Sequence, residues 1–125
     1  MEQYKLGEME QRHADLIWEH EPISSRTLTE LCAEAFNWKR TTTYTMLKRL
    51  CERELFQNQS GMVSALMSKN DFLAGQGEQF LNDTFDGSLP QFFAAFTRRN
   101  KLSKKEISEI QQLIGEQYSE KMHCS

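Results

Sequence analysis

Hydrophobic and polar residues in the first half of the chain repeat with the spacing of amphipathic α-helices. Residues 7–20 predict a first helix, whose inward positions are Met9, His13, Leu16, Ile17 and His20. Pro22 ends this helix, because proline disfavours helical geometry in the residue before it. Ser24-Ser25 is a good N-cap pair for a second helix, with inward positions at Leu28, Leu31, Cys32 and Ala35. A third helix over residues 40–54 has on its inward face Thr43, Met46, Leu47, Leu50 and Cys51.

Two short apolar segments after the third helix are strand candidates. They span residues 55–57 and 62–67, and the turn-forming tetrad Asn58-Gln59-Ser60-Gly61 separates them. Three helices followed by a small hairpin are the outline of a winged helix-turn-helix. We therefore predict a mainly α fold with a small β-wing, in which residues 1–69 form the winged helix-turn-helix domain.

The second half of the chain, residues 70–125, is predicted to be a helical region. Asp86-Gly87-Ser88 breaks the helical pattern, and Pro90 is well placed near the start of the next helix. The last helix has a clear start, because Ser103 and Glu106 have the spacing of a capping box and Leu102 with Ile107 that of a hydrophobic staple.

This helical region has about 55 residues, which is too few to bury a comfortable core alone. Its apolar positions nevertheless require burial, and the simplest solution is a symmetric homodimer in which two copies cover each other. The alternative is that these helices fold back on the winged domain of the same chain. The residues that we predict for dimerisation are Phe85, Leu89, Phe92, Phe93, Phe96, Ile107, Ile110, Leu113 and Ile114.

The net charge of −3 conceals two basic segments. Residues 39–53 carry five basic residues and one acidic residue, and residues 98–105 carry five basic residues and no acidic one. The first segment coincides with the third helix, and a helix that enters the major groove needs short polar side chains for base edges and cations for phosphates. We predict that Thr41, Thr42, Tyr44 and Thr45 face the bases and that Arg40, Lys48 and Arg49 face the phosphates of double-stranded DNA. The second segment is better explained as a solvated surface.

Two alternatives to DNA binding remain. In the first, the charged face of the third helix is simply solvated. In the second, the winged domain is a protein–protein interaction adaptor that does not bind DNA. The acidic net charge and the uncharged wing favour the adaptor. An enzyme is not expected, because the chain has no nucleophile elbow, phosphate loop, HExxH or CxxC motif.

The cysteine and histidine content predicts neither a disulfide scaffold nor a metal or other cofactor. Cys32, Cys51 and Cys124 are an odd set without paired spacing, which is typical of a reducing compartment. His123-Cys124 supplies only two of the four ligands of a tetrahedral metal site. The polar N-terminus does not look like a signal peptide, and no apolar segment has the roughly 20 residues that a membrane span needs. We therefore expect a cytoplasmic protein with no membrane partner.

Three separated segments resemble the penicillinase repressor family, of the BlaI and MecI type, and its copper-responsive CopY branch. LGEME at residues 6–10 with LIW at 16–18 resembles the opening helix of that family, and RTTTYTMLKRL at 40–50 resembles its recognition helix. FDGSL at 85–89, followed by LSKKEI at 102–107, resembles its dimerisation region. The resemblance implies a dimeric winged-helix transcriptional repressor that binds an inverted-repeat operator and is released by proteolysis or by metal chemistry.

The sequence departs from the family pattern at several positions. The family usually has an aliphatic residue in place of Thr43 and often a basic one in place of Tyr44, and its wing is charged, whereas residues 60–67 carry no charge. The proteolytic members are cut at an Asn-Phe bond, where this chain has Ala95-Phe96. The copper branch has paired Cys-x-Cys motifs, which this chain lacks. The sequence therefore supports neither release mechanism.

Overall fold

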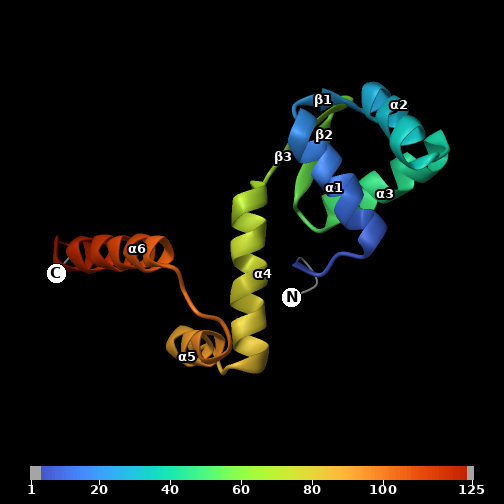
Figure 1. Ribbon diagram of the computed structural model, residues 1–125. Coiled ribbons are helices and arrows are strands. Elements are labelled where there is room, and N and C mark those ends of the chain that lie inside the picture. The colour runs from blue at the N-terminus through green and yellow to red at the C-terminus, as the bar shows by residue number, and fades with distance from the viewer. Residues whose placement is uncertain (1–3, 124–125) are drawn as a thin grey trace.

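The computed structural model describes the backbone of residues 4–123 and the side chains of residues 4–120. The chain folds into a winged-helix domain, followed by three helices that extend away from it (Figure 1). The elements in chain order are α1 (Glu8–His20), β1 (Ile23–Ser24), α2 (Ser25–Phe36), α3 (Arg40–Glu52), β2 (Phe56–Gln59), β3 (Met62–Ala65), α4 (Lys69–Thr84), α5 (Leu89–Arg99) and α6 (Lys104–His123).

The sheet has three antiparallel strands in the order β1-β3-β2. The predicted hairpin is confirmed, but Asn58 and Gln59, which were predicted to lie in its turn, belong to β2 because they pair with β3. The turn consists of Ser60 and Gly61, whose φ angles of 52° and 86° fit the left-handed geometry of a tight hairpin turn. The sequence did not predict β1, which pairs Ile23 with Val63 along one edge of the wing. Two residues are too few to show an alternating pattern, so this strand is defined only by the strand it pairs with.

The hydrophobic core lies in the winged-helix domain and draws on all three of its helices, its sheet and the start of α4. The buried apolar residues are Ala14, Ile17, Ile23, Leu28, Cys32, Leu47, Leu50, Leu55, Phe56, Val63 and Phe72. This list confirms the inward faces of the three predicted helices with three corrections. Met9, His20 and Ala35 were predicted to face inward and are exposed. Each lies in the first or last turn of its helix, where the helix extends beyond the elements that cover its middle.

Local capping explains where the helices begin and end. The Ser24 side chain accepts a hydrogen bond from the Thr27 amide at the start of α2, as predicted. The capping box of α6 is also confirmed, since the Ser103 amide donates to Glu106 Oε1 at 3.0 Å and the Glu106 amide donates to Ser103 Oγ at 3.1 Å. The third helix ends at Glu52 rather than at residue 54, because Glu54 has a left-handed φ of 62°.

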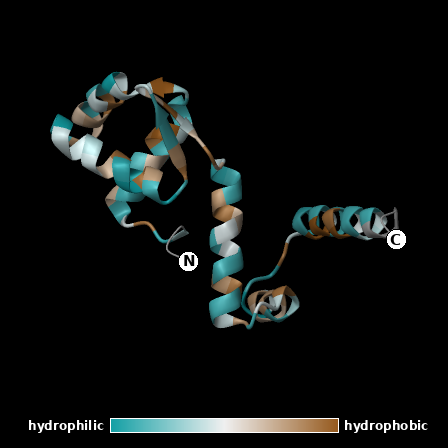
Figure 2. Cartoon of the chain, turned by 180° about the vertical axis from the view of Figure 1, so that it is seen from behind, coloured by the Kyte–Doolittle hydropathy of each residue, from teal (hydrophilic) through white to brown (hydrophobic). Residues whose placement is uncertain are grey.

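The last three helices do not return to the winged-helix domain. In Figure 1, α4 runs away from that domain, α5 lies at its far end, and α6 points further out. The alternative in which these helices fold back on their own winged domain is therefore wrong. None of the residues of α5, all of which the structure describes, is buried. Figure 2 shows hydrophobic residues along both α5 and α6. No helix in the described part of the chain is both long and apolar enough to cross a membrane.

Candidate nucleic-acid interface

The third helix presents a polar face to solvent because its apolar face is held in the core. The buried residues on the inner side of this helix are Thr43, Leu47 and Leu50. Six of the seven residues predicted to contact DNA are exposed on the outer side, namely Arg40, Thr41, Thr42, Thr45, Lys48 and Arg49. The structure thus brings these six predicted residues together on one exposed face.

The cations of this face are not neutralised by any carboxylate whose side chain the structure describes. Arg40, Lys48 and Arg49 form no ion pair with any carboxylate among the side chains of residues 4–120. The Arg49 guanidinium lies 3.7 Å from the sulfur of Met46, a weak acceptor. Free cations on a convex helix face are available to neutralise phosphates, whereas cations in ion pairs would first have to give up their partners.

Tyr44, the seventh predicted residue, is half-buried and tied to neighbouring residues. Its hydroxyl donates a hydrogen bond to Ser25 Oγ at 3.2 Å, and the Arg40 guanidinium lies 5.8 Å from the centre of its ring. The contact with Ser25 and the neighbouring guanidinium of Arg40 lower the pKa of the Tyr44 hydroxyl. The Ser25 amide in turn donates to the Gly61 carbonyl at 2.8 Å. Tyr44 therefore links the start of α3 to the start of α2 and to the turn of the wing.

Two hollows flank the outer face of α3. One lies between the helix and the wing and is lined by Tyr44, Leu47, Lys48, Cys51 and Asn58. The other lies on the opposite flank and is lined by Thr41, Thr42, Thr45, Met46 and Arg49. The wing beside them offers amide and hydroxyl groups but no charge, because Asn58, Gln59 and Ser60 are its exposed polar residues.

Arg53, the last cation of the first basic segment, belongs to a different environment. It forms an ion pair with Glu10 on α1 at 3.6 Å and donates a hydrogen bond to the Lys5 carbonyl. The second basic segment, residues 98–105, is exposed at the junction of α5 and α6 and remote from α3 within one chain (Figure 1). The sequence therefore groups Arg53 with the cations of the α3 face, whereas in the fold Arg53 binds Glu10 and Lys5.

Eight of the nine residues predicted for dimerisation lie in two apolar features on the last three helices. Phe80, Phe85, Phe92 and Phe96 form an aromatic cluster with ring centroids 5.5 to 6.1 Å apart. A groove between α5 and α6 is lined by Leu89, Pro90, Phe93, Ile110, Leu113, Ile114 and Gln117. The ninth residue, Ile107, is exposed and lines neither the aromatic cluster nor the groove. Large exposed apolar surfaces of this kind are typical of interaction sites.

The cysteines and histidines whose side chains the structure describes do not assemble into a chemical site. Burial raises the pKa values of Cys32 and Cys51, which keeps both thiols protonated and unreactive. Burial also lowers the pKa of His13 to about 4, so its ring is neutral at physiological pH. Among the residues with described side chains, no three His, Cys, Asp or Glu lie close enough to hold a metal ion. Cys124 and the side chain of His123 lie outside the described residues.

Comparison with known proteins adds to this geometry. The family model described as penicillinase repressor matches residues 6–116 of the chain. The chain is also 25% identical, over 121 residues, to the penicillinase repressor of Bacillus licheniformis, and the match covers 94% of each of the two chains. Both matches span the winged-helix domain and most of the three helices that follow it.

Proposed function

This chain belongs to the penicillinase repressor family, and from that premise we propose that it acts as a homodimer that occupies an inverted-repeat operator. Membership of this family makes it a DNA-binding transcriptional repressor rather than an enzyme, and it favours DNA binding over the adaptor alternative. The proposed repressor acts in the cytoplasm by covering a promoter, which requires no further chemistry.

The exposed and unneutralised outer face of α3 carries this proposal. Thr41, Thr42 and Thr45 offer hydroxyls for base edges and methyl groups that fit against the methyl of thymine. Lys48 and Arg49 follow on the same exposed side, where they reach phosphates as the helix lies in the major groove. Tyr44 supports this arrangement, because its ring lies beneath the Arg40 guanidinium and its hydroxyl fixes the ring against α2.

The exposed apolar surface of the last three helices supports the homodimer. Phe96 is 42% exposed and Leu113 is 61% exposed, although both are residues that cores normally contain. A second copy of the same surface covers them in the proposed dimer. Two linked winged domains then bind two half-sites, and the second binding event is strengthened by its high effective concentration.

The salt dependence of DNA binding tests the role of the α3 face. A duplex carrying the inverted repeat nearest to the start of the gene serves as the probe. Replacing Arg49 with alanine removes two phosphate contacts from a symmetric dimer, so the slope of log affinity against log salt should shrink by about 2. Arg12→Ala is the matched control, because Arg12 is exposed on α1 and its loss changes the net charge equally.

The two variants differ in their salt slopes if the proposal is right. Arg12→Ala leaves the slope unchanged, whereas Arg49→Ala reduces it. An unchanged slope in Arg49→Ala contradicts a phosphate contact at this position. A wild-type protein whose affinity for the duplex does not depend on salt contradicts DNA binding through this face altogether.

A further inference from the structure

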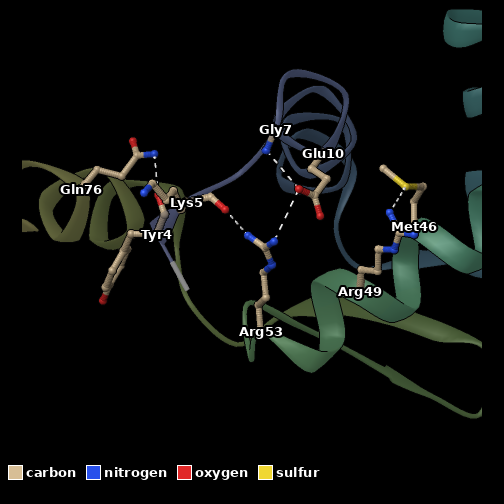
Figure 3. A network of polar contacts seen from close by, with 8 residues as sticks. All are labelled: Tyr4, Lys5, Gly7, Glu10, Met46, Arg49, Arg53 and Gln76. Carbon is tan, nitrogen blue, oxygen red and sulfur yellow. Dashed lines mark hydrogen bonds and ion pairs between the residues drawn. The ribbon is translucent and has the colours of Figure 1, made fainter. Parts of the chain in front are cut away.

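The first described residues of the chain lie across the junction between the winged-helix domain and α4 (Figure 3). We call residues 4–7 the N-terminal strap. At one end of the strap, the Gly7 amide donates to Glu10 Oε1 at 3.0 Å, and Arg53 donates to the Lys5 carbonyl. Arg53 also pairs with Glu10 at 3.6 Å, where the two side chains are only 24% and 14% exposed. The strap is thereby fastened to Arg53, the residue that follows the end of α3.

The other end of the strap is fastened to α4. The Tyr4 ring packs against Phe72 with centroids 5.7 Å apart, and the Tyr4 carbonyl accepts a hydrogen bond from Gln76 Nε2 at 3.1 Å. The ring lies directly over Gly75, where an added Cβ would come within 2.1 Å of Tyr4 Cε1. Gly75 therefore provides the space in which Tyr4 sits. Gly77, two residues further along, has nothing within 4 Å of such a Cβ.

The strap extends the hold of the winged-helix core along α4. Phe72 in the first turn of α4 is fully buried between Tyr4 and Trp18, whose ring centroid lies 5.4 Å from that of Phe72. Lys69 adds an ion pair with Asp15 of α1 at 3.1 Å. Tyr4 carries these contacts one turn further, because it holds both Gly75 and Gln76.

Small angular changes at this junction become large displacements at the far end of α4. The helix has 16 residues, which corresponds to a length of about 24 Å. A rotation of about 10° at its base moves the far end by about 4 Å, which exceeds the rise of about 3.4 Å between base pairs. The angle at which α4 leaves the winged-helix domain therefore controls where α3 meets DNA relative to α5 and α6.

We propose that the N-terminal strap is a positioning element that fixes this angle and so selects the spacing between the two half-sites of the operator. Tyr4 and Gly75 are its key residues, and neither belongs to the outer face of α3. This inference rests on the proposed homodimeric repressor.

The first test measures the angle without DNA. Spin labels are attached to Glu30→Cys on α2 and Asn82→Cys near the end of α4, in a background in which Cys51 and Cys124 are serine. The labelled chain is mixed with an excess of unlabelled chain, so that pulsed electron paramagnetic resonance reports distances within one copy. The wild type should give one narrow distance distribution. Gly75→Ala, which displaces the Tyr4 ring, should broaden it.

The second test measures operator binding on duplexes whose central spacer is lengthened or shortened by one or two base pairs. The wild type should prefer one spacer by about 100-fold, since avidity is lost where both half-sites cannot be engaged. Tyr4→Ala and Gly75→Ala should reduce this preference to less than about tenfold. Tyr4→Phe retains the ring and the carbonyl and should keep the preference of the wild type.

Thermal unfolding separates loss of the strap from a change in the helix itself. Alanine stabilises a helix more than glycine does, so Gly77→Ala should raise Tm. Gly75→Ala should raise Tm less, because the new methyl group displaces the Tyr4 ring from α4. In the Tyr4→Ala background the two substitutions should raise Tm equally. A narrow label distribution in Gly75→Ala, or an unchanged spacer preference in Tyr4→Ala, would overturn the inference. If the wild type binds none of the duplexes, the proposed function fails, and the label distances still decide whether the strap fixes the angle.

Discussion

Acidification should destabilise this protein through His13, whose imidazole is fully buried in the winged-helix core. Neither ring nitrogen has a hydrogen-bond partner in the described part of the chain. The edge of the ring meets Trp38 at a centroid distance of 5.2 Å. Burial disfavours the charged form and lowers the pKa of His13 from 6.5 to about 4.

The direction of the effect follows from where each state takes up a proton. The unfolded chain protonates His13 as the pH falls through 6.5, whereas the folded protein resists protonation until about pH 4. Above pH 6.5 the neutral His13 ring therefore costs the folded state least. The free energy of unfolding decreases as the pH falls from 6.5 toward 4. At about 1.4 kcal/mol per pH unit, the full loss is about 3 kcal/mol, of which about 2 kcal/mol falls between pH 7 and pH 5.

Urea unfolding followed by circular dichroism at pH 7, 6 and 5, at one protein concentration, measures this loss. The range ends above the ordinary pKa values of carboxyl groups, about 3.9 to 4.3, so these groups contribute little. His13→Leu places an apolar side chain of similar size in the core and should remove about 2 kcal/mol of the loss between pH 7 and pH 5. His20→Gln removes an exposed histidine from the same helix and should leave the loss unchanged. If His13→Leu loses as much free energy of unfolding as the wild type, the reasoning is refuted.

Two further predictions concern the surfaces. Tyr44→Phe keeps the ring beneath Arg40 but loses the hydrogen bond to Ser25. The free energy of operator binding, measured by fluorescence anisotropy, should therefore weaken by about 0.5 to 1.5 kcal/mol. An affinity equal to that of the wild type would show that this bond does not position α3. Phe96→Glu places a charge in the aromatic cluster of each copy and should give a monomer in light scattering, whereas Leu66→Glu, an exposed position before α4, should leave the dimer intact. A dimer that survives Phe96→Glu would place the interface elsewhere.

Much of the fold could be predicted from the sequence because its signals are local. Ser24, Ser88 and Ser103 each cap a helix through a side chain that reaches only three residues ahead. The apolar spacing within each helix similarly reports one face of one element. The strand at Ile23 could not be predicted, because it exists only through its pairing with Val63, which lies far away in the sequence.

The candidate site divides in the same way. The cations and threonines of α3 were predictable, because their charge and spacing lie within a single helix. The tie between Tyr44 and Ser25 was not, and neither was the use of Arg53 by Glu10, because both depend on how separate elements pack. Gly75 illustrates the limit most clearly. Helix propensity identifies it as a weak point of α4, whereas the structure shows that it provides the space for Tyr4.

The two halves of the chain differ in what stabilises them, and this difference has a consequence for regulation. The winged-helix domain encloses its own core, so α3 keeps its shape in a single copy. None of the residues of α5, a helix described along its whole length, is buried. In the proposed dimer, the packing of α5 and α6 therefore depends on the second copy. A signal that separates the two copies then removes the avidity of operator binding without altering any residue that faces DNA. Such a signal acts on the contact between the two copies alone, because the α3 face itself remains intact in each of them.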